Sequence, residues 1–87
     1  MKKVVDQITD YMRGAAMDGG IISLDISQDM HVTPDQASAR LAYMEVTGRA
    51  ICVGEQKNVA REIGSRRPFK IYILPHEKEE YYGLHNS

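Results

Sequence analysis

The stretch from Val32 to Ala50, V-T-P-D-Q-A-S-A-R-L-A-Y-M-E-V-T-G-R-A, constrains the fold more than any other part of the chain. It opens with a helix start signal. Thr33 suits an N-cap, Pro34 suits the first helical position, and Gln36 completes a capping box. Apolar residues then recur at helical spacing until a glycine stop. The pattern predicts a helix over about 33–47.

The two faces of this predicted helix differ. At about 100° per residue, one face carries the apolar stripe Ala37, Leu41 and Met44, which we expect to be buried. The opposite face is small and partly apolar, and Arg40 lies on its flank with Gln36. The residues of that outer face are Asp35, Ser38, Ala39, Ala42, Tyr43 and Val46. What this face contacts decides between the functions considered below.

Upstream of it, apolar residues at helical spacing predict a first helix over about 2–14, which the following glycine pair ends. Ile21 and Ile22 then form a very short strand or fill the core. Ser23 is expected to cap a second helix over about 24–30. The whole predicted core consists of Ile8, Ile22, Ile26, Met30, Ala37, Leu41, Met44, Ile51 and Ile71.

Two strand-like runs follow, over 50–53 and 69–74, and we expect them to pair antiparallel across the loop 55–67. Within that loop, the residues from Asn58 to Ile63 suit a single helical turn. Strict alternation makes Cys52 an outward-facing residue. The inward positions are then Ile51, Val53, Phe69, Ile71 and Ile73.

Eighty-seven residues suit one small domain without room for a deep substrate cavity. We expect that domain over 1–75 and a polar, flexible tail over 76–87. No apolar run approaches the roughly 18 residues of a membrane span, and the N-terminus lacks the apolar block of a signal peptide. These features predict a cytoplasmic protein. The single cysteine excludes an internal disulfide and a cysteine-cluster metal site.

Positive charge is concentrated in one segment, although the net charge of the chain is −1. Residues 1–54 contain five basic and seven acidic side chains, and residues 71–87 contain one and three. Residues 55–70 contain five basic side chains against two acidic ones. The basic residues of that segment are Lys57, Arg61, Arg66, Arg67 and Lys70. Such a loop suits phosphate contacts, although a basic loop can also serve solubility alone.

The order helix, short strand, helix, turn, helix and two-stranded wing resembles the winged helix-turn-helix family from about residue 22 to residue 74. In I-S-L-D-I-S-Q-D-M-H-V-T, Ile26 takes the apolar slot, Ser27 the small slot and Met30 the last apolar slot. A-x-x-x-L-x-x-M-E-x-x-G-R-A resembles the recognition helix running into the wing. The chain is similar in size and layout to small bacterial and phage transcriptional regulators, including fimbrial regulators of the FaeA/PapI type. It departs from the family at His31, where glycine is frequent because the turn needs a left-handed backbone.

The resemblance implies an α+β fold, a three-helix winged helix-turn-helix with a two-stranded antiparallel wing. It also implies that the third helix enters the major groove of double-stranded DNA while the wing contacts the backbone. The predicted DNA-binding residues are Thr33, Gln36, Ser38, Ala39, Arg40, Tyr43, Lys57, Arg61, Arg66 and Arg67. Lys2 and Lys3 are candidates for a further phosphate contact. We expect a transcriptional regulator that acts as a homodimer or with a helper protein, without a cofactor, a small-molecule substrate or a membrane partner.

Catalysis has little support in the sequence. His31, His76 and His85 share no metal-ligand spacing, no histidine is placed beside Cys52, and no glycine-rich phosphate loop is present. We therefore expect a protein that is not an enzyme and has no metal site. The alternative function is a protein-binding module, such as a phage-encoded inhibitor or adaptor. It would use the apolar outer surface formed by Ala39, Ala42, Tyr43 and Val46.

Overall fold

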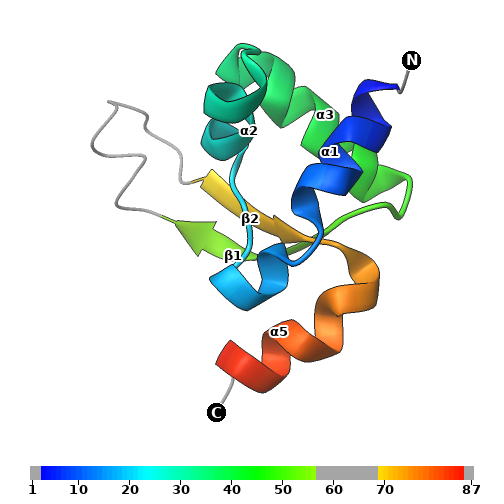
Figure 1. Cartoon of the computed structure of the whole chain (residues 1–87), viewed down its shortest axis with the longest axis vertical. Coiled ribbons are helices and arrows are strands. Elements are labelled where there is room, and N and C mark those ends of the chain that lie inside the picture. Colours follow the sequence, from blue (N-terminus) through cyan, green and yellow to red (C-terminus); the bar gives the residue numbers. More distant parts are fainter. Residues whose placement is uncertain (1–2, 57–68, 86–87) are drawn as a thin grey trace.

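The computed structural model describes residues 3–56 and 69–85 of the chain. The elements in chain order are α1 (Val4–Met12), the 3₁₀ turn η1 (Ala15–Asp18), α2 (Ser23–Met30), α3 (Pro34–Val46), β1 (Ile51–Gln56), β2 (Phe69–Ile73), the 3₁₀ turn η2 (Pro75–Glu77) and α5 (Lys78–His85). The described part is therefore α+β, with four α-helices and a two-stranded antiparallel sheet, a layout compatible with a winged helix. In Figure 1, α1, α2 and α3 gather on one side of the sheet and α5 lies on the other.

The first two helices follow the predicted order with small corrections at their ends. Helix α1 ends at Met12, and Gly14 adopts a left-handed backbone (φ 82°), so the break comes earlier than the glycine pair. Ser23 is not the N-cap of α2 but its first residue. The preceding backbone N–H, that of Ile22, donates to the Asp25 carboxylate at 3.0 Å, so an acidic side chain supplies half of a capping box.

Helix α3 begins as its sequence predicts. The Thr33 hydroxyl accepts the backbone N–H of Gln36 at 3.1 Å, and the Gln36 side-chain oxygen accepts the N–H of Thr33 at 3.1 Å. Pro34 occupies the first turn. The stripe Ala37, Leu41 and Met44 is fully buried, which confirms the predicted register. The capping box and the stripe together fix which side of α3 faces outward.

The strands pair as predicted but face differently. Cys52 lies opposite Tyr72, and a bulge between Cys52 and Gly54 shifts the register. Tyr72 and Leu74 belong to the main hydrophobic core and Cys52 packs against it, so the expected outward position of Cys52 is wrong. Ile71 and Ile73 face the other way, toward Gly20, where the left-handed backbone (φ 90°) and the missing side chain permit close approach. Both faces of β2 are therefore covered.

Most of the predicted core is confirmed. Ile8, Ile22, Ile26, Ala37, Leu41 and Met44 are buried. Met30, Ile51 and Ile71 are only partly buried, which corrects the prediction for these three. Ile21 forms the short strand that the sequence left open, because its backbone exchanges two hydrogen bonds with Tyr72, at 2.9 and 2.8 Å.

The C-terminal segment corrects the expected flexible tail, because residues 78–85 form α5. Glu77, just before it, is 6% exposed. Its carboxylate accepts the backbone N–H groups of Gly14 at 2.8 Å and Ala16 at 3.4 Å. This contact fastens the end of the chain to the loop after α1. In the part of the chain that the structure describes, no helix is long and apolar enough to cross a membrane.

Candidate nucleic-acid interface

The turn between α2 and α3 fixes how α3 is presented. His31 adopts the left-handed conformation (φ 57°, ψ 41°), which confirms the strained turn expected there. The Ser27 hydroxyl donates to the carbonyl of Val32 at 2.7 Å, across the turn. The left-handed backbone at His31 and the hydrogen bond from Ser27 to Val32 therefore set the orientation of α3 relative to α2.

The outer face of α3 is open to solvent along its length. The exposed residues are Asp35, Ser38, Ala39, Arg40, Ala42, Tyr43 and Val46. Tyr43 is 53% exposed and Val46 is 85% exposed, although both side chains are largely apolar. The small residues Ser38 and Ala39 leave room for close approach, and Ser38 carries a group that can hydrogen-bond a base or a phosphate.

The other predicted contacts on α3 have additional roles. Thr33 and Gln36 are exposed, but each is engaged in the capping box described above. Arg40 lies on the flank, at the rim of an apolar hollow of about 220 Å³ between α1, α2 and α3. The hollow is lined by Val4, Ile8, Ile26, Met30, Val32, Gln36, Ala37 and Arg40. The apolar outer surface of Ala39, Ala42, Tyr43 and Val46 is also exposed and lies outside this lining.

Lys70 is the only basic residue of this segment that the structure describes. The stretch 57–68 lies outside the described residues, and with it Lys57, Arg61, Arg66, Arg67 and the helical turn expected near Asn58. The last strand pairs before it are Glu55 with Lys70 and Gln56 with Phe69. In the sequence this segment therefore connects the open ends of β1 and β2. Lys2 of the N-terminal pair is also outside the described residues, whereas Lys3 is exposed ahead of α1.

Two tyrosines join the elements around α3. The Tyr11 hydroxyl on α1 donates to the Asp29 carboxylate on α2 at 2.5 Å. This hydrogen bond, together with burial, raises the pKa of Tyr11 to about 12. Tyr72 donates to the Glu45 carboxylate on α3 at 3.4 Å. Burial, followed by the charge of Glu45, raises the pKa of Tyr72 to about 12. Both hydroxyls are therefore protonated near neutral pH.

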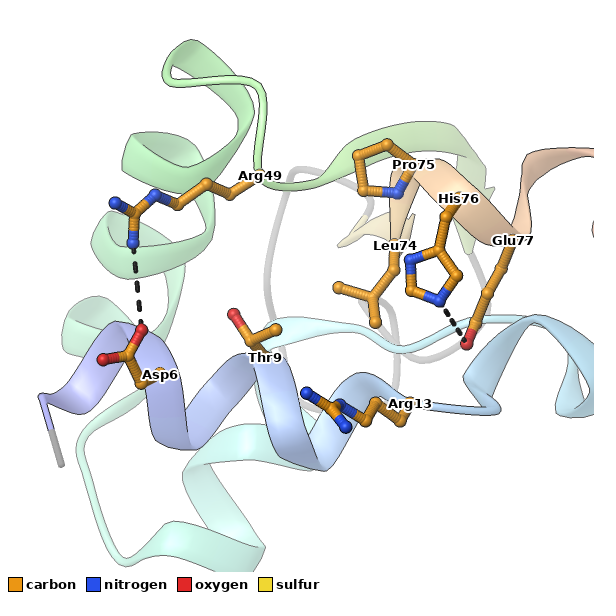
Figure 2. A pocket seen from close by; sticks show the side chains of 8 residues that line it. All are labelled: Asp6, Thr9, Arg13, Arg49, Leu74, Pro75, His76 and Glu77. Carbon is orange, nitrogen blue, oxygen red and sulfur yellow. Dashed lines mark ion pairs between the residues drawn. The ribbon is translucent and has the colours of Figure 1, made fainter.

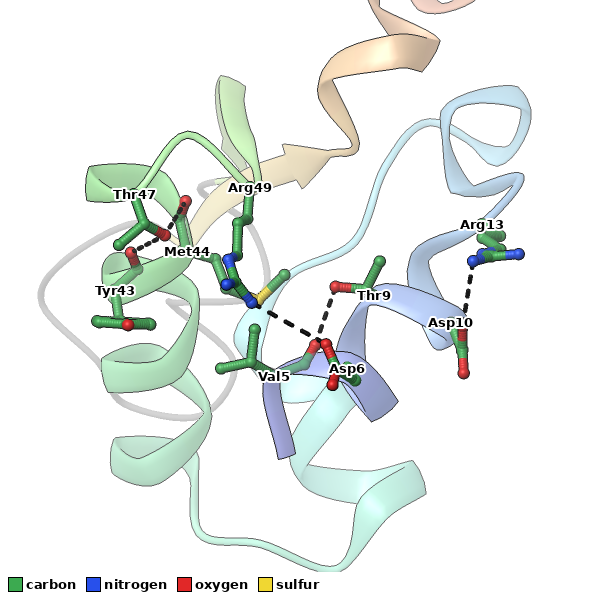
Figure 3. A network of polar contacts seen from close by, with 9 residues as sticks. All are labelled: Val5, Asp6, Thr9, Asp10, Arg13, Tyr43, Met44, Thr47 and Arg49. Carbon is green, nitrogen blue, oxygen red and sulfur yellow. Dashed lines mark hydrogen bonds and ion pairs between the residues drawn. The ribbon is translucent and has the colours of Figure 1, made fainter. Parts of the chain in front are cut away.

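Sequence reasoning missed a polar network beside the C-terminal end of α3 (Figure 3). Arg49, which follows α3, lies 4.0 Å from Asp6 on α1, and Arg13 lies 3.4 Å from Asp10 one turn earlier. The Thr9 hydroxyl donates to the Val5 carbonyl at 2.9 Å. The ion pair between Asp10 and Arg13 could have been predicted from their three-residue spacing. The contact between Asp6 and Arg49 could not, because the two residues are far apart in the sequence.

Metal binding finds no support among the described residues. No group of three histidine, cysteine or acidic side chains there could hold a metal ion. His31 is used in the turn, and the His76 ring lies 3.6 Å from Glu77. The Cys52 thiol is partly buried and lies 3.5 Å from the Gly54 carbonyl.

The chain matches no protein-family model, no curated protein and no solved structure. The winged helix-turn-helix resemblance therefore remains a prediction from the residues and from the compatible order of elements.

Proposed function

We propose that this protein is a sequence-specific, double-stranded DNA-binding transcriptional regulator. In this proposal α2 and α3 form the helix-turn-helix and α3 enters the major groove. Ser38 and Ala39 lie against base edges, and Arg40 and Tyr43 reach phosphates. Arg66 and Arg67, with Lys57 and Arg61, contact the backbone without reading sequence. Thr33 and Gln36 lie at the end of the helix nearest the groove.

The observation that carries the proposal is the way α3 is held. Its N-terminus is fixed by the His31 turn and by a reciprocal capping box, and its inner stripe is completely buried. A helix anchored in this way presents one fixed face, as groove reading requires. The small residues Ser38 and Ala39 near its N-terminal end permit approach to the groove floor.

A single copy has few side chains able to read bases. Operators are typically bound about 4–10 kcal/mol more tightly than random DNA, and Ser38 and Arg40 alone fall short of that difference. We therefore infer that a homodimer or a helper protein completes the regulator. The prediction is a salt-dependent affinity for DNA at every sequence, with specificity appearing only in the assembled form.

Fluorescence anisotropy with mixed DNA fragments over a salt series tests this function. The affinity should fall steeply as salt rises. Ala39→Glu should abolish binding, because a carboxylate on the outer line of α3 repels phosphate and fills the space left by alanine. Met17→Glu is the matched control. It adds the same charge on η1, at a side chain that is 65% exposed. Equal DNA binding by both variants would reject a role for α3 in the groove.

One observation favours a second function, a protein-binding module. Ala39, Ala42, Tyr43 and Val46 form an apolar line without a basic residue, and Val46 is 85% exposed. Exposed apolar patches often mark protein contacts. Under this alternative, Ala39→Glu leaves DNA affinity unchanged but turns a dimer into a monomer or prevents binding of another protein, as size-exclusion chromatography with light scattering would detect.

A further inference from the structure

An open cavity of about 660 Å³ lies on a side of the molecule that the proposed function does not use (Figure 2). Its walls come from three separate segments of the chain. They are α1 with the residue after it, Arg49 beyond the end of α3, and residues 74–77 after β2. A volume of this size lies within the range of about 300–1,000 Å³ that is usual for small-molecule sites. The cavity is therefore large enough to hold a compact metabolite.

Three basic side chains line this cavity, one from each wall. Arg13 comes from the end of α1, Arg49 from the segment after α3, and His76 from η2. Their side chains are 70%, 50% and 72% exposed. Each lies near a carboxylate, but only at 3.4, 4.0 and 3.6 Å respectively. These distances exceed the roughly 2.7–3.2 Å of a good N–H···O bond, so the donors are weakly engaged.

The carboxylates at the cavity are placed differently from the basic groups. The carboxylate of Glu77 is 8% exposed as a side chain, and both its oxygens accept backbone N–H groups, from Gly14 and Ala16. Its charge is thus satisfied within the protein. Asp6 lies at one edge, beside Arg49, as Figure 2 shows. The Asp6 side chain is 54% exposed, so its carboxylate faces solvent beside Arg49. Away from that edge, Arg13 and His76 are exposed donors, which favours a ligand that accepts hydrogen bonds.

The rest of the lining adds an apolar surface. Leu74 and Pro75 form one wall between Arg49 and His76. Guanidinium groups bind carboxylate and phosphate oxygens through two parallel N–H donors, which gives such contacts direction as well as charge. A ligand with an oxyanion at one end and a small apolar body at the other would match both features.

We propose that this cavity binds a small organic anion, a compact molecule with one carboxylate or phosphate group. Arg13, Arg49 and His76 hold the anionic group, and Leu74 and Pro75 contact the apolar body. Since Arg49 follows α3 and His76 lies in η2, the bound anion would connect the segment after α3 with the segment after β2. The site does not depend on DNA binding, and its failure would leave the proposed function untouched.

The test is an NMR titration of the full chain with inorganic phosphate, phenyl phosphate and benzoate, followed at the arginine Nε–H signals. The signals of Arg13 and Arg49 should shift and saturate. Phenyl phosphate should bind about tenfold more tightly than inorganic phosphate, because its ring covers apolar surface. Whether phenyl phosphate or benzoate binds more tightly identifies the preferred anionic group.

Variants make the result decisive. Arg13→Gln combined with Arg49→Gln should weaken phenyl phosphate binding at least about tenfold, since charge-assisted hydrogen bonds are lost. Lys78→Gln, at an exposed side chain that does not line the cavity, should leave it unchanged. Arg49→Lys, which keeps the charge but loses the forked donor, gives an intermediate loss and serves if the double variant does not fold. The absence of saturable shifts at Arg13 and Arg49, or wild-type affinity in the double variant, would overturn the proposal. The proposal would also be overturned if the wild-type chain bound none of the small anions and the double variant bound DNA more weakly than the wild type.

Discussion

The two faces of α3 are both apolar at their centres, yet only one is buried. On the inner face Ala37, Leu41 and Met44 are 0% exposed. On the outer face Val46 is 85% exposed and Tyr43 is 53% exposed. Composition cannot separate these faces, whereas helical position does. The fold explains the inner stripe completely and leaves the outer line unexplained, so the outer line is where a partner is expected.

The largest contrast between the faces should appear in stability. Leu41→Ala removes a fully buried side chain and should lower the free energy of unfolding by about 2–5 kcal/mol. Val46→Ala, on the same helix, should change it by less than about 0.5 kcal/mol, because the side chain is already in water. Urea denaturation followed by circular dichroism measures both. Equal losses at the two positions would mean that the outer face is covered in solution.

A second prediction tests the electrostatic part of the proposed DNA contact, which comes from the basic segment rather than from α3. Replacing Arg66 and Arg67 together by alanine should weaken DNA binding similarly on all sequences. It should also lower the slope of log affinity against log salt by about two units, one for each lost phosphate contact. Anisotropy titrations at several salt concentrations give the slope. Arg13→Gln is the control for loss of positive charge elsewhere. An unchanged slope in the double variant would remove this segment from the interface.

Local sequence signals predicted α3 well because its determinants lie within four residues of one another. Thr33 and Gln36 satisfy each other's backbone, and the inner stripe needs only helical spacing. The prediction of which strand residues face inward was wrong for a physical reason. Alternation identifies the inward face only when the other face is in water, and β2 is covered on both faces. Tyr72 packs in the main hydrophobic core, whereas the next residue, Ile73, is buried on the opposite face of the sheet.

The C-terminal helix and the cavity could not be predicted from the sequence for a related reason. The polar sequence of α5 has no apolar stripe that would mark it. It is preceded by Glu77, whose partners Gly14 and Ala16 lie more than sixty residues earlier, at separations of 63 and 61. Arg13, Arg49 and His76 likewise come together only after folding. The candidate DNA residues on α3 could be named from the sequence, whereas the anion site could not.

A smaller effect should distinguish the two ends of α3. Thr33→Ala removes the N-cap and should lower the free energy of unfolding by about 0.5–2 kcal/mol. Thr47→Ala, at the C-cap, removes a hydroxyl that donates to the Tyr43 carbonyl at 2.9 Å in an exposed position. That change should cost less than about 0.5 kcal/mol. Thermal and urea unfolding of both variants provide the comparison. A larger loss at Thr47 would show that the capping box does not fix the start of the helix.

The last predicted effect concerns alkaline pH and the tyrosine that lies behind the inner face of α3. Burial and the Glu45 carboxylate raise the pKa of Tyr72 to about 12, above its usual value of about 10 in an unfolded chain. The unfolded state therefore releases this proton first. The resulting stabilisation is complete below about pH 10 and is lost as the pH rises through about 12.

Tyr72→Phe should consequently flatten the decline in unfolding free energy between pH 10 and 12, relative to the wild type. Tyr11 contributes to the same decline, since its pKa is also raised to about 12, so Tyr11→Phe should flatten it as well. Val46→Ala, at an exposed position on the outer face, is the control and should leave the decline unchanged, because the lost side chain carries no titratable group. Urea midpoints at about pH 10, 11 and 12 measure the slope, because the decline begins near the ordinary tyrosine pKa of about 10. A decline that Tyr72→Phe and Val46→Ala flatten equally would contradict the assignment of this pH dependence to Tyr72.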